Sequence, residues 1–433
     1  MVWIGFVILI ILIILGVPIA YSFGAATIWM VFSLGYSPDF LMPAAYAKLN
    51  GVVLLAIPLF ILAGGLMEKG NIGDALVGFI ERFVGHIRGS LCVVSTITCA
   101  VFGSICGSGA ATLSCIGTIL APKMREKKYN MGVAAAIICC SAPLGMLIPP
   151  SSIQILYGWT GQLSVLACFL STVIPGIILT ALISVAGWFM IRNTPGMEVS
   201  EPDAPGTSWI GNTGRATKHA IPALLMPIII LGGIYSGIMT PSEAAGISCV
   251  YAIPVGFLIY KGLTWKSFKN TLVDTATSTG SIMVMLAIIM VMSRILVMEN
   301  VPDQILSLLM MISTNKYVIL LMINIFLVII GMIMDDVSGT LLCTPILIPI
   351  AIKLGVSPYQ MAAILGVNLG MGNITPPTAP FLYLSGKICG SNAKEMIKPC
   401  LTIILFAYVP VLILTTYVPS LSLWLPQHIL GIG

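Results

Sequence analysis

The chain has 433 residues, of which 58% are apolar and only 8% charged, with a mean hydropathy of +1.06 and a net charge of +5. Soluble domains carry about a quarter of their residues as charged side chains, so most of this chain cannot face water. The composition therefore excludes a soluble globular protein. No basic cluster is long enough to indicate a nucleic-acid partner.

Apolar runs long enough to cross about 30 Å of hydrocarbon recur along the whole chain. They are Val2–Ile19, Gly51–Met67, Leu163–Met190, Ala220–Ile238, Ala244–Tyr260, Ser281–Val297, Tyr317–Met334 and Leu401–Val418. In lipid the backbone must satisfy its own hydrogen bonds, and these runs lack the alternating polarity of barrel strands. The first run also lacks the basic region of a cleaved signal. We therefore predict an all-α polytopic membrane protein whose first helix is permanent.

The two halves of the chain are repeats of each other. Gly331 matches Gly103, and Gly372–Pro377 matches Gly145–Pro150 at the same separation to within one residue. A register held this closely over about fifty positions indicates a duplication rather than chance. The repeated units cover roughly residues 50–190 and 280–418.

Each repeat contains two short apolar segments around a polar tip. In the first half Ser90–Cys106 and Ser108–Ala121 meet at a Gly-Ser-Gly turn. In the second half Val318–Met334 and Gly339–Ile352 flank Asp335–Ser338. This pattern predicts a re-entrant helical hairpin in each half, entering and leaving the membrane on one side.

The apolar run after each hairpin is interrupted. Pro143–Pro150 breaks the run that starts near Met131, and Gly370–Pro377 breaks the run that starts near Tyr359. Glycine weakens a helix, and proline removes a donor and clashes with the preceding turn. Freed carbonyls at membrane depth are tolerated only where protein or a polar cavity meets them. We therefore predict one broken transmembrane helix in each half.

Charge indicates the direction of the two hairpins. Four cations and one acid follow the first hairpin, whereas Lys353 alone follows the second. The cations are Lys123, Arg125, Lys127 and Lys128, and the acid is Glu126. The positive-inside rule places the first hairpin on the cytoplasmic side and the second on the opposite side. The repeats are therefore predicted to be inverted, as in secondary transporters whose sites lie near the midplane.

Five parts are predicted along the chain. They are scaffold helices and an interfacial arm at 1–90, the hairpin and broken helix of the first half at 91–192, a polar linker at 193–218, scaffold helices and an arm of the second half at 219–315, and the second hairpin, broken helix and C-terminal helix at 316–433. Asn71–Arg88 and Thr264–Leu272 are amphipathic and are predicted to be the interfacial arms.

Hairpin tips and broken helices offer carbonyls, hydroxyls and amides, the oxygen ligands that a desolvated cation needs. We predict two sodium sites there. The cytoplasmic-side site would use Ser104, Gly107, Ser108 and Gly145, and the other would use Ser338, Gly339, Gly372, Asn373, Thr375 and Thr378. Asn373 and Thr375 are expected to project to one side of an extended segment. The alternative is that these glycines, serines and prolines only permit tight turns and close packing.

Ionisable side chains inside a membrane cost about 2.5–3.5 kcal/mol even on insertion scales, so each needs a reason. Asp335 and Asp336 at the second tip, together with Arg294 in an apolar run, are candidates for binding an anionic substrate. Alternatively, the acids are solvated at the tip, and Arg294 pairs with Glu299 or a lipid headgroup.

Several other polar groups are predicted to be structural. Thr240, Pro241 and Glu243 have the form of a capping box at a helix start. The eleven cysteines show no Cys-x-x-Cys spacing and the three histidines are scattered, so neither a transition-metal site nor another cofactor is expected.

Four segments carry a resemblance to a known family: Gly237–Ala245, Gly331–Asp335, Thr344–Pro349 and Asn368–Pro380. They resemble the large membrane subunit of tripartite ATP-independent periplasmic (TRAP) transporters, and the likeness covers nearly the whole chain. The resemblance implies a sodium-driven elevator importer of the bacterial inner membrane. It also implies two partners: a small membrane subunit, and a periplasmic binding protein that delivers an organic acid.

The tip Asp335–Thr340 looks more like the sialic-acid branch of this family, because a single Asp followed by Pro is usual in the dicarboxylate branch. No extra helices precede the first span, so the small subunit is expected to be a separate chain. The main alternative is a stand-alone sodium/dicarboxylate-type symporter without a binding protein. A membrane-embedded enzyme would need a facing nucleophile, metal or acid pair, and a channel would not need two opposed hairpins.

The topology is open to a direct test. Cysteines introduced as Lys127→Cys and Gly355→Cys on a cysteine-light background should react from the cytoplasmic side and from the outside, respectively. The reason is the basic cluster that follows only the first hairpin. Labelling of intact cells and of inverted vesicles measures this, and reaction of both from one side would contradict inverted repeats.

Overall fold

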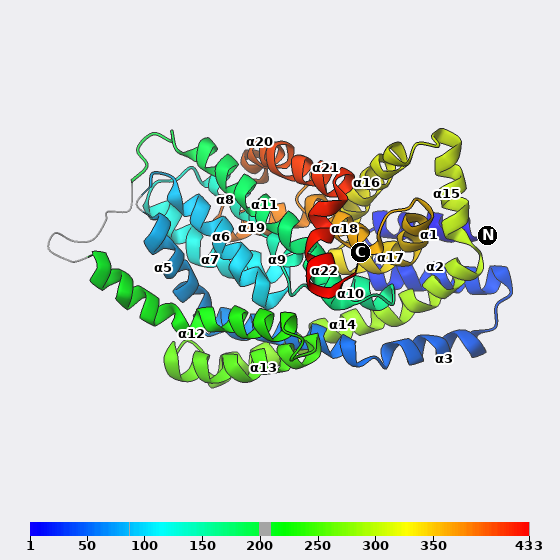
Figure 1. Ribbon diagram of the computed structural model, residues 1–433, viewed down its shortest axis with the longest axis horizontal. Coiled ribbons are helices and arrows are strands. Elements are labelled where there is room, and N and C mark those ends of the chain that lie inside the picture. Colours follow the sequence, from blue (N-terminus) through cyan, green and yellow to red (C-terminus); the bar gives the residue numbers. More distant parts are fainter. Residues whose placement is uncertain (86, 199–208, 433) are drawn as a thin grey trace.

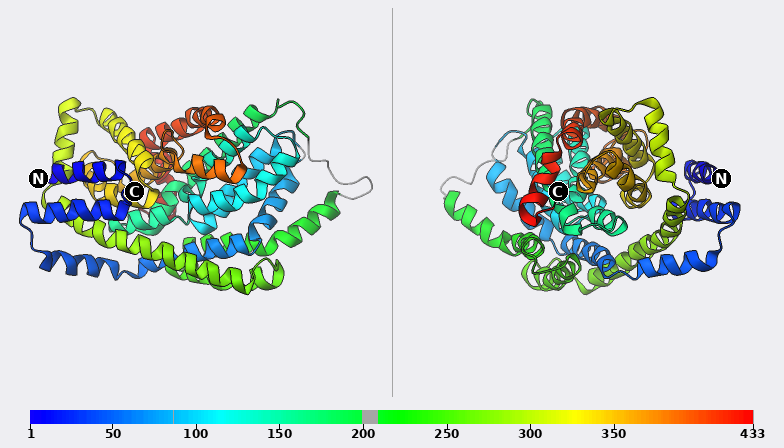
Figure 2. Two further views of the ribbon diagram at one scale, coloured as in Figure 1. Left: turned by 180° about the vertical axis from the view of Figure 1, so that it is seen from behind. Right: turned by 45° about the vertical axis from the view of Figure 1, so that its right-hand side comes forward.

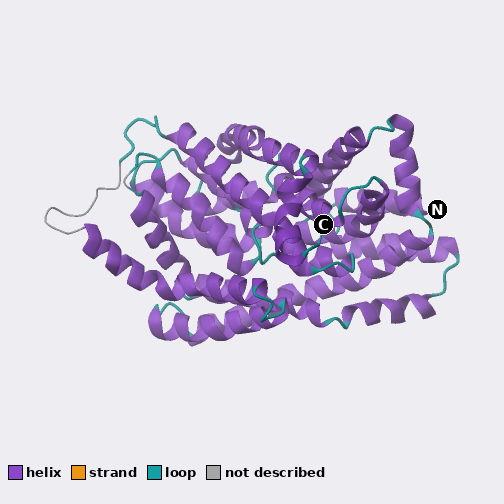
Figure 3. Cartoon of the chain, viewed as in Figure 1, coloured by secondary structure: helices purple, strands orange, loops and turns teal. Residues whose placement is uncertain are grey.

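The computed structural model describes residues 1–85, 87–198 and 209–432, and every regular element in these ranges is a helix (Figure 3). Within these ranges, eight helices are long and apolar enough to cross a membrane, or nine if the bent pair Met131–Leu147 and Ser152–Thr160 counts as one span. The predicted all-α membrane fold is confirmed. The centre of the predicted linker, 199–208, lies outside the described residues.

The first half begins with helices that pack on one another and on the start of the second half. They are α1 (Val2–Ile14), α2 (Ile19–Leu34), α3 (Pro38–Leu49), the 3-10 helix η1 (Val52–Leu55), α4 (Ala56–Lys69) and α5 (Ile72–Val84). The hairpin and broken helix follow as α6 (Ser90–Cys106), α7 (Gly109–Glu126), α8 (Met131–Ser141), α9 (Leu144–Leu147) and α10 (Ser152–Thr160), and α11 (Val165–Ile191) ends the half.

The second half repeats this order. It contains α12 (Trp209–Tyr235), α13 (Pro241–Pro254), the π-helix η2 (Val255–Ile259), α14 (Trp265–Met298), α15 (Val301–Ile312), α16 (Lys316–Ile333), α17 (Asp336–Lys353), α18 (Pro358–Gly372), α19 (Pro380–Cys389), α20 (Ala393–Ile403), the π-helix η3 (Ile404–Tyr408), α21 (Val409–Tyr417) and α22 (Pro419–Leu430). The capping box is confirmed at the start of α13, where the Thr240 N–H donates to the Glu243 carboxylate at 2.8 Å.

Both predicted hairpins are present, as α6–α7 and α16–α17. The first tip, Gly107–Ser108, turns in the left-handed conformation at Gly107 (φ 61°), which glycine adopts without steric cost. The second tip turns at Met334–Asp335, and the Asp335 carboxylate caps α17 by accepting the N–H groups of Val337 (3.1 Å) and Ser338 (3.3 Å). A glycine turn and an acidic cap thus make equivalent corners in the two halves.

Both predicted broken helices are present as well. In the first half only the short α9 lies between α8 and α10, and we call residues 142–151 the first break. In the second half residues 373–379 separate α18 from α19 and form the second break. Both breaks contain a cis Pro-Pro bond. After the breaks, α10 starts with Ser152 and α19 with Pro380. In the first turn of a helix the backbone N–H has no partner within the helix, so neither residue removes a helical hydrogen bond there.

The hairpins open at opposite ends of the molecule. Helix α5, which leads into the first hairpin, lies at the left end in Figure 1, whereas α15, which leads into the second, lies at the right end. The long helices α12, α13 and α14 run along the lower edge, and the same layer is seen from behind in Figure 2. The hairpins and breaks pack together on one side of this layer.

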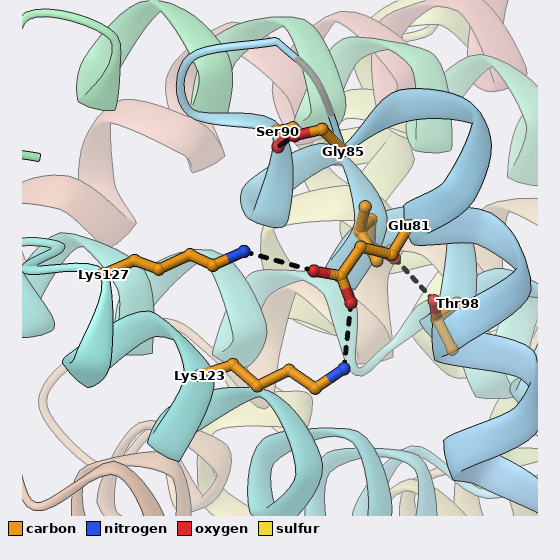
Figure 4. A network of polar contacts seen from close by, with 7 residues as sticks. Glu81, Gly85, Ser90, Thr98, Lys123 and Lys127 are labelled. Atoms are coloured by element: carbon orange, nitrogen blue, oxygen red, sulfur yellow. Dashed lines mark hydrogen bonds and ion pairs between the residues drawn. The ribbon is translucent and has the colours of Figure 1, made fainter. Parts of the chain in front are cut away.

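The arm helices are joined to the outer ends of the hairpins by ion pairs. On α5, Glu81 bonds Lys123 at 2.9 Å and Lys127 at 3.4 Å, both near the end of α7 (Figure 4). On α15, Asp303 bonds Lys353 of α17 at 2.5 Å. Thr264–Leu272, predicted to be an interfacial arm, do not form a helix of their own: they are the capped start of the 34-residue α14. The short helix α15 stands directly before the second hairpin, as α5 stands before the first.

We expect Glu81→Gln to lower the midpoint of thermal unfolding at neutral pH. Burial raises the pKa of Glu81, but the hydrogen bond and charge of Lys123, with those of Lys127, outweigh it and hold the pKa below its ordinary value. A carboxyl group whose pKa is lower in the folded protein than in the unfolded chain stabilises the fold at pH values above the unfolded-state pKa of about 4.3. This stabilisation is lost as the pH falls through the pKa of the folded state. The expected loss, about 1 kcal/mol, should therefore disappear in acid.

Scanning fluorimetry of the purified protein at neutral and acidic pH measures this difference. Glu126→Gln is the matched control, because Glu126 is exposed near the same cluster and the described contacts give it no ion pair. An equal loss in both variants, or a loss independent of pH, would show that the paired lysines do not stabilise α5.

Candidate functional site

The first hairpin and the first break meet backbone to backbone. A methyl group added at Gly103 of α6 would overlap the Cα atom of Gly145 and lie 2.8 Å from its nitrogen. A methyl group at Gly145 would lie 3.0 Å from the Ser108 carbonyl oxygen at the tip. Only glycine permits both approaches. Two of the predicted sodium-site residues, Ser108 and Gly145, are therefore neighbours.

The tip carbonyl is held by the helix that follows the break. The Gly107 carbonyl accepts the Ser152 N–H at 3.2 Å and the Ser152 hydroxyl at 2.9 Å. Ser152 begins α10, so the positive end of that helix faces the tip. This residue was not among the predicted site residues. The signal that could have identified it is the Ser151-Ser152 pair directly after two prolines, a common helix start.

The two predicted hydroxyls at the first tip have hydrogen bonds of different kinds: Ser104 donates and Ser108 accepts. Ser104, which is buried, donates to the Val101 carbonyl at 2.7 Å. The Ser108 hydroxyl accepts the Ala111 N–H at 3.5 Å, and the Ser108 carbonyl accepts the Thr112 hydroxyl at 2.8 Å. A serine hydroxyl that donates once retains lone pairs on its oxygen. These oxygens can therefore still coordinate a cation.

The second hairpin and break reproduce the same contact with the equivalent glycines. A methyl group at Gly372 would lie 2.6 Å from the Gly331 Cα atom and 2.9 Å from the Met332 nitrogen. The Met332 carbonyl accepts the hydroxyl of Thr378 from the far side of the break. At the tip, the buried Ser338 donates to the Asp335 carboxylate, and Gly339 packs against Leu369. The predicted residues of the second site thus surround one tip-and-break contact.

Asn373 is the exceptional residue of the second break. It is 1% exposed, and neither its side-chain oxygen nor its side-chain nitrogen has a hydrogen-bond partner among the described residues. A buried polar atom left unpaired costs about 1–3 kcal/mol. Its backbone carbonyl accepts the Phe381 N–H at 3.2 Å. The orphaned amide lies directly after the Gly331–Gly372 contact, where a ligand atom would satisfy it.

The prediction of an extended segment at 373–375 is wrong. The N–H groups of Ile374 and Thr375 donate to the carbonyls of Met371 (3.3 Å) and Gly372 (3.0 Å), so α18 ends in a further turn. The Thr375 hydroxyl donates to Met371 at 2.6 Å. A turn is favoured over an extended segment here because the last backbone carbonyls of α18 need hydrogen-bond donors. Thr375 therefore offers only its oxygen lone pairs to a ligand.

The three predicted substrate ligands are not brought together. The Asp335 side chain caps α17. The next residue, Asp336, is half-buried, and its backbone carbonyl accepts the Thr340 hydroxyl at 2.7 Å. Arg294 of α14 lines a cavity with Pro345 of α17, and Pro345 stands about 14 Å along that helix from the tip at 1.5 Å per residue. The alternative Arg294–Glu299 pair is not seen among the described contacts: Glu299 accepts the Tyr36 hydroxyl at 2.5 Å.

Two inverted repeats, each with a re-entrant tip packed on a broken helix, define the architecture of a secondary transporter. The comparison with known families agrees. Residues 6–421 match the family described as "Tripartite ATP-independent periplasmic transporter, DctM component", and the chain belongs to this family. The predicted resemblance is confirmed, and the protein is a multi-pass protein of the bacterial inner membrane. Permeases of this kind generally work with a small membrane subunit and a periplasmic binding protein.

Relatives with three different substrates match at similar identity. The isethionate TRAP transporter permease of Oleidesulfovibrio alaskensis is 32% identical over 95% of this chain, which spans 64% of that protein's length. The C4-dicarboxylate large permease of Pseudomonas aeruginosa is 32% identical over 93% of this chain and 92% of its own. The sialic acid large permease of Vibrio cholerae is 30% identical over 96% of both. These relatives are named as transporter permeases, not enzymes.

A solved structure shares the fold. The YdaH transporter of Alcanivorax borkumensis superposes with a TM-score of 0.60 over 87% of this chain and 88% of that chain, at 14% sequence identity. At this identity the likeness concerns the fold alone.

We expect Gly103→Ala to destabilise the protein by about 1–3 kcal/mol, since the added methyl group meets backbone atoms of Gly145 that cannot move aside. Gly246→Ala in α13 is the matched control, because no atom of the described residues lies within 4 Å of a methyl group there. That control should be neutral or slightly stabilising, as alanine is the better helix former. Thermal unfolding midpoints measure both changes, and similar midpoints for the two variants would contradict the close tip-and-break contact.

Proposed function

We propose that the chain is the membrane permease of a sodium-coupled importer, which receives an organic acid from a periplasmic binding protein and moves it by an elevator motion. In this motion the hairpins and broken helices would move together against the scaffold helices. The observation that carries the proposal is the mirrored contact of tip and break through Gly103–Gly145 and Gly331–Gly372.

Sodium fits the groups that meet at these contacts. Each helix break frees backbone carbonyls, and each tip adds hydroxyl or carboxylate oxygens, which are hard ligands suited to a small hard cation. The buried Asn373 supplies an amide oxygen without a partner. A cation at the second break would satisfy that oxygen and the lone pairs of Thr375. The mirrored geometry at the first break supports a second ion there.

The hairpin-and-break unit is bound together by hydrogen bonds that cross between the two halves. Gln154 donates to the Ala362 carbonyl at 3.2 Å and Tyr157 to the Pro358 carbonyl at 2.8 Å. In the other direction Ser385 donates to Ala135 and Tyr408 to Cys140, both at 2.7 Å. All four donors are buried, so these bonds are shielded from water. Such bonds favour movement of residues 91–192 and 316–433 as one body.

For the substrate we retain sialic acid as the first candidate, on the Asp335–Thr340 tip sequence. Relatives named for isethionate and C4-dicarboxylates match the chain as well as the sialic acid relative does, so overall identity does not rank the three. All three are organic acids. The alternative of a stand-alone dicarboxylate symporter differs in one respect: it would not need a binding protein.

Uptake into proteoliposomes tests the proposal. The permease is reconstituted with its small subunit, and sialic acid, succinate or isethionate is offered with and without a cognate binding protein. Uptake of one of these acids should require the binding protein and an inward sodium gradient, and should not respond to ATP. Undiminished uptake with potassium in place of sodium would overturn the coupling, and uptake without the binding protein would favour the stand-alone symporter.

Within that assay, Asn373→Ala and Thr375→Val should raise the half-saturating sodium concentration. Loss of a ligand worth roughly 1–2 kcal/mol corresponds to about a five- to thirty-fold change in affinity. Thr402→Val is the matched control: its hydroxyl also donates to the carbonyl four residues earlier, at 3.0 Å, but it lies half-buried on α20, away from both breaks, and its hydrogen bond is exposed. Unaltered sodium dependence in both site variants would show that these side chains only pack.

A further inference from the structure

A second polar site lies between the scaffold helices and the hairpin-and-break unit. A cavity of about 310 Å³ separates the end of α3 and the second half of α14 from the end of α10 and the second half of α17. Lys48, Ser293 and Arg294 line it from the scaffold side, and Trp159, Thr160 and Pro345 from the opposite side. The volume is at the lower end of the range for small-molecule sites.

Two cations share this cavity without a counter-charge. No aspartate or glutamate is among the described residues that line it. Both Lys48 and Arg294 are exposed, and within the described part of the chain neither forms an ion pair. Like charges facing one space repel unless an anion or water screens them. The cavity is therefore electrostatically suited to an anion.

The opposite wall supplies the rest of a small-molecule site. The Thr160 hydroxyl is shielded from solvent and has no hydrogen-bond partner in the described structure. Beside it the Trp159 side chain is 9% exposed, and Pro345 and Ile348 add apolar surface. An acid group held by two cations, with a hydroxyl and an apolar wall around its carbon skeleton, matches the usual composition of a ligand pocket.

We propose that Lys48 and Arg294 form a capture site for the carboxylate or sulfonate group of the transported anion. The inference rests on the proposed function and adds the chemistry that recognises the substrate. Arg294 is assigned here apart from the tip acids Asp335 and Asp336. The cavity lies toward the end of α17 that carries Lys353. The charge pattern places this end of the helix outside the cytoplasm. An anion released by the binding protein on that side would therefore meet Lys48 and Arg294 first.

The position of the cavity also gives the site a way to release its ligand. One wall belongs to the scaffold and the other to the unit proposed to move, so movement of that unit separates Thr160 from the two cations. The anion then loses part of its binding surface. Capture and release would follow from the same motion.

Arg294→Gln and Lys48→Gln test the site in the reconstituted complex. Each should raise the half-saturating concentration of the transported acid by about ten-fold or more, as expected for a lost hydrogen bond to a charged group. Arg294→Lys should recover part of the loss. Sodium dependence should remain unchanged. Lys266→Gln is the matched control, since it removes one exposed cation from the opposite end of α14 and should leave the value unchanged.

Binding to the purified complex in detergent separates the possible ligands. Succinate, isethionate and sialic acid are titrated in turn, and the thermal midpoint is recorded for wild type and variants. The transported acid should raise the midpoint of wild type but not of Arg294→Gln or Lys48→Gln. If instead phosphatidylglycerol produces that difference and none of the acids does, the cavity binds a lipid phosphate and the proposal is overturned.

Two outcomes distinguish the inference from the proposed function. Wild-type uptake with unchanged half-saturation in both glutamine variants would overturn the capture site and leave the proposed function standing. Absence of sodium-driven uptake in wild type, with acid binding that still depends on Lys48 and Arg294, would overturn the proposed function and support the site. Arg294→Lys keeps the test decisive if a glutamine variant fails to fold.

Discussion

An interrupted helix inside a membrane must find partners for the backbone groups that it frees, and the rest of this structure depends on that requirement. No water is available in hydrocarbon to accept or donate the missing hydrogen bonds. Each break here is therefore covered by a re-entrant tip. The start of α10 donates to the Gly107 carbonyl, and Thr378 donates to the Met332 carbonyl. Each break thus brings a donor to a backbone carbonyl of the hairpin packed on it.

This close contact explains the glycines. Backbone can approach backbone only where no Cβ intervenes, and both halves meet at paired glycines, Gly103 with Gly145 and Gly331 with Gly372. The contact also brings carbonyl, hydroxyl and amide oxygens together in a small space. One of them, the Asn373 amide, is left unpaired. The geometry that protects the backbone is thus the same geometry that suits a cation.

Two kinds of contact hold the parts of the molecule in place, and they differ in character. Within the hairpin-and-break unit, buried donors from one half reach carbonyls of the other, as from Tyr157 to Pro358. Between the arms and the hairpins, the contacts are ion pairs closer to solvent, such as Asp303–Lys353. Buried hydrogen bonds are costly to break, whereas exposed ion pairs contribute little and exchange readily with water. This difference favours a firm inner unit within a more adaptable frame.

Much of the fold could be predicted from the sequence because the relevant signals are local. Hydropathy over about twenty residues indicates a span, a glycine at a tip indicates a turn, and Thr240 with Glu243 indicates a helix start. The repeat was visible because duplicated segments keep their spacing. The sequence also indicated which residues gather at each tip and break. It misjudged the backbone at 373–375, where the unpaired carbonyls of α18 draw in the following N–H groups.

The sequence by itself thus determined the class of protein, the two repeats and the placement of the breaks, since these depend on composition and near neighbours. The tertiary structure alone decided which distant groups meet. Three such contacts are Ser152 on the Gly107 carbonyl, Asp303 of α15 on Lys353, and Lys48 in one cavity with Arg294, and all depend on how helices pack. Contacts between residues tens to hundreds of positions apart leave no periodicity in a single sequence, because many pairings satisfy the same hydropathy and only one satisfies shape, charge and hydrogen bonding together.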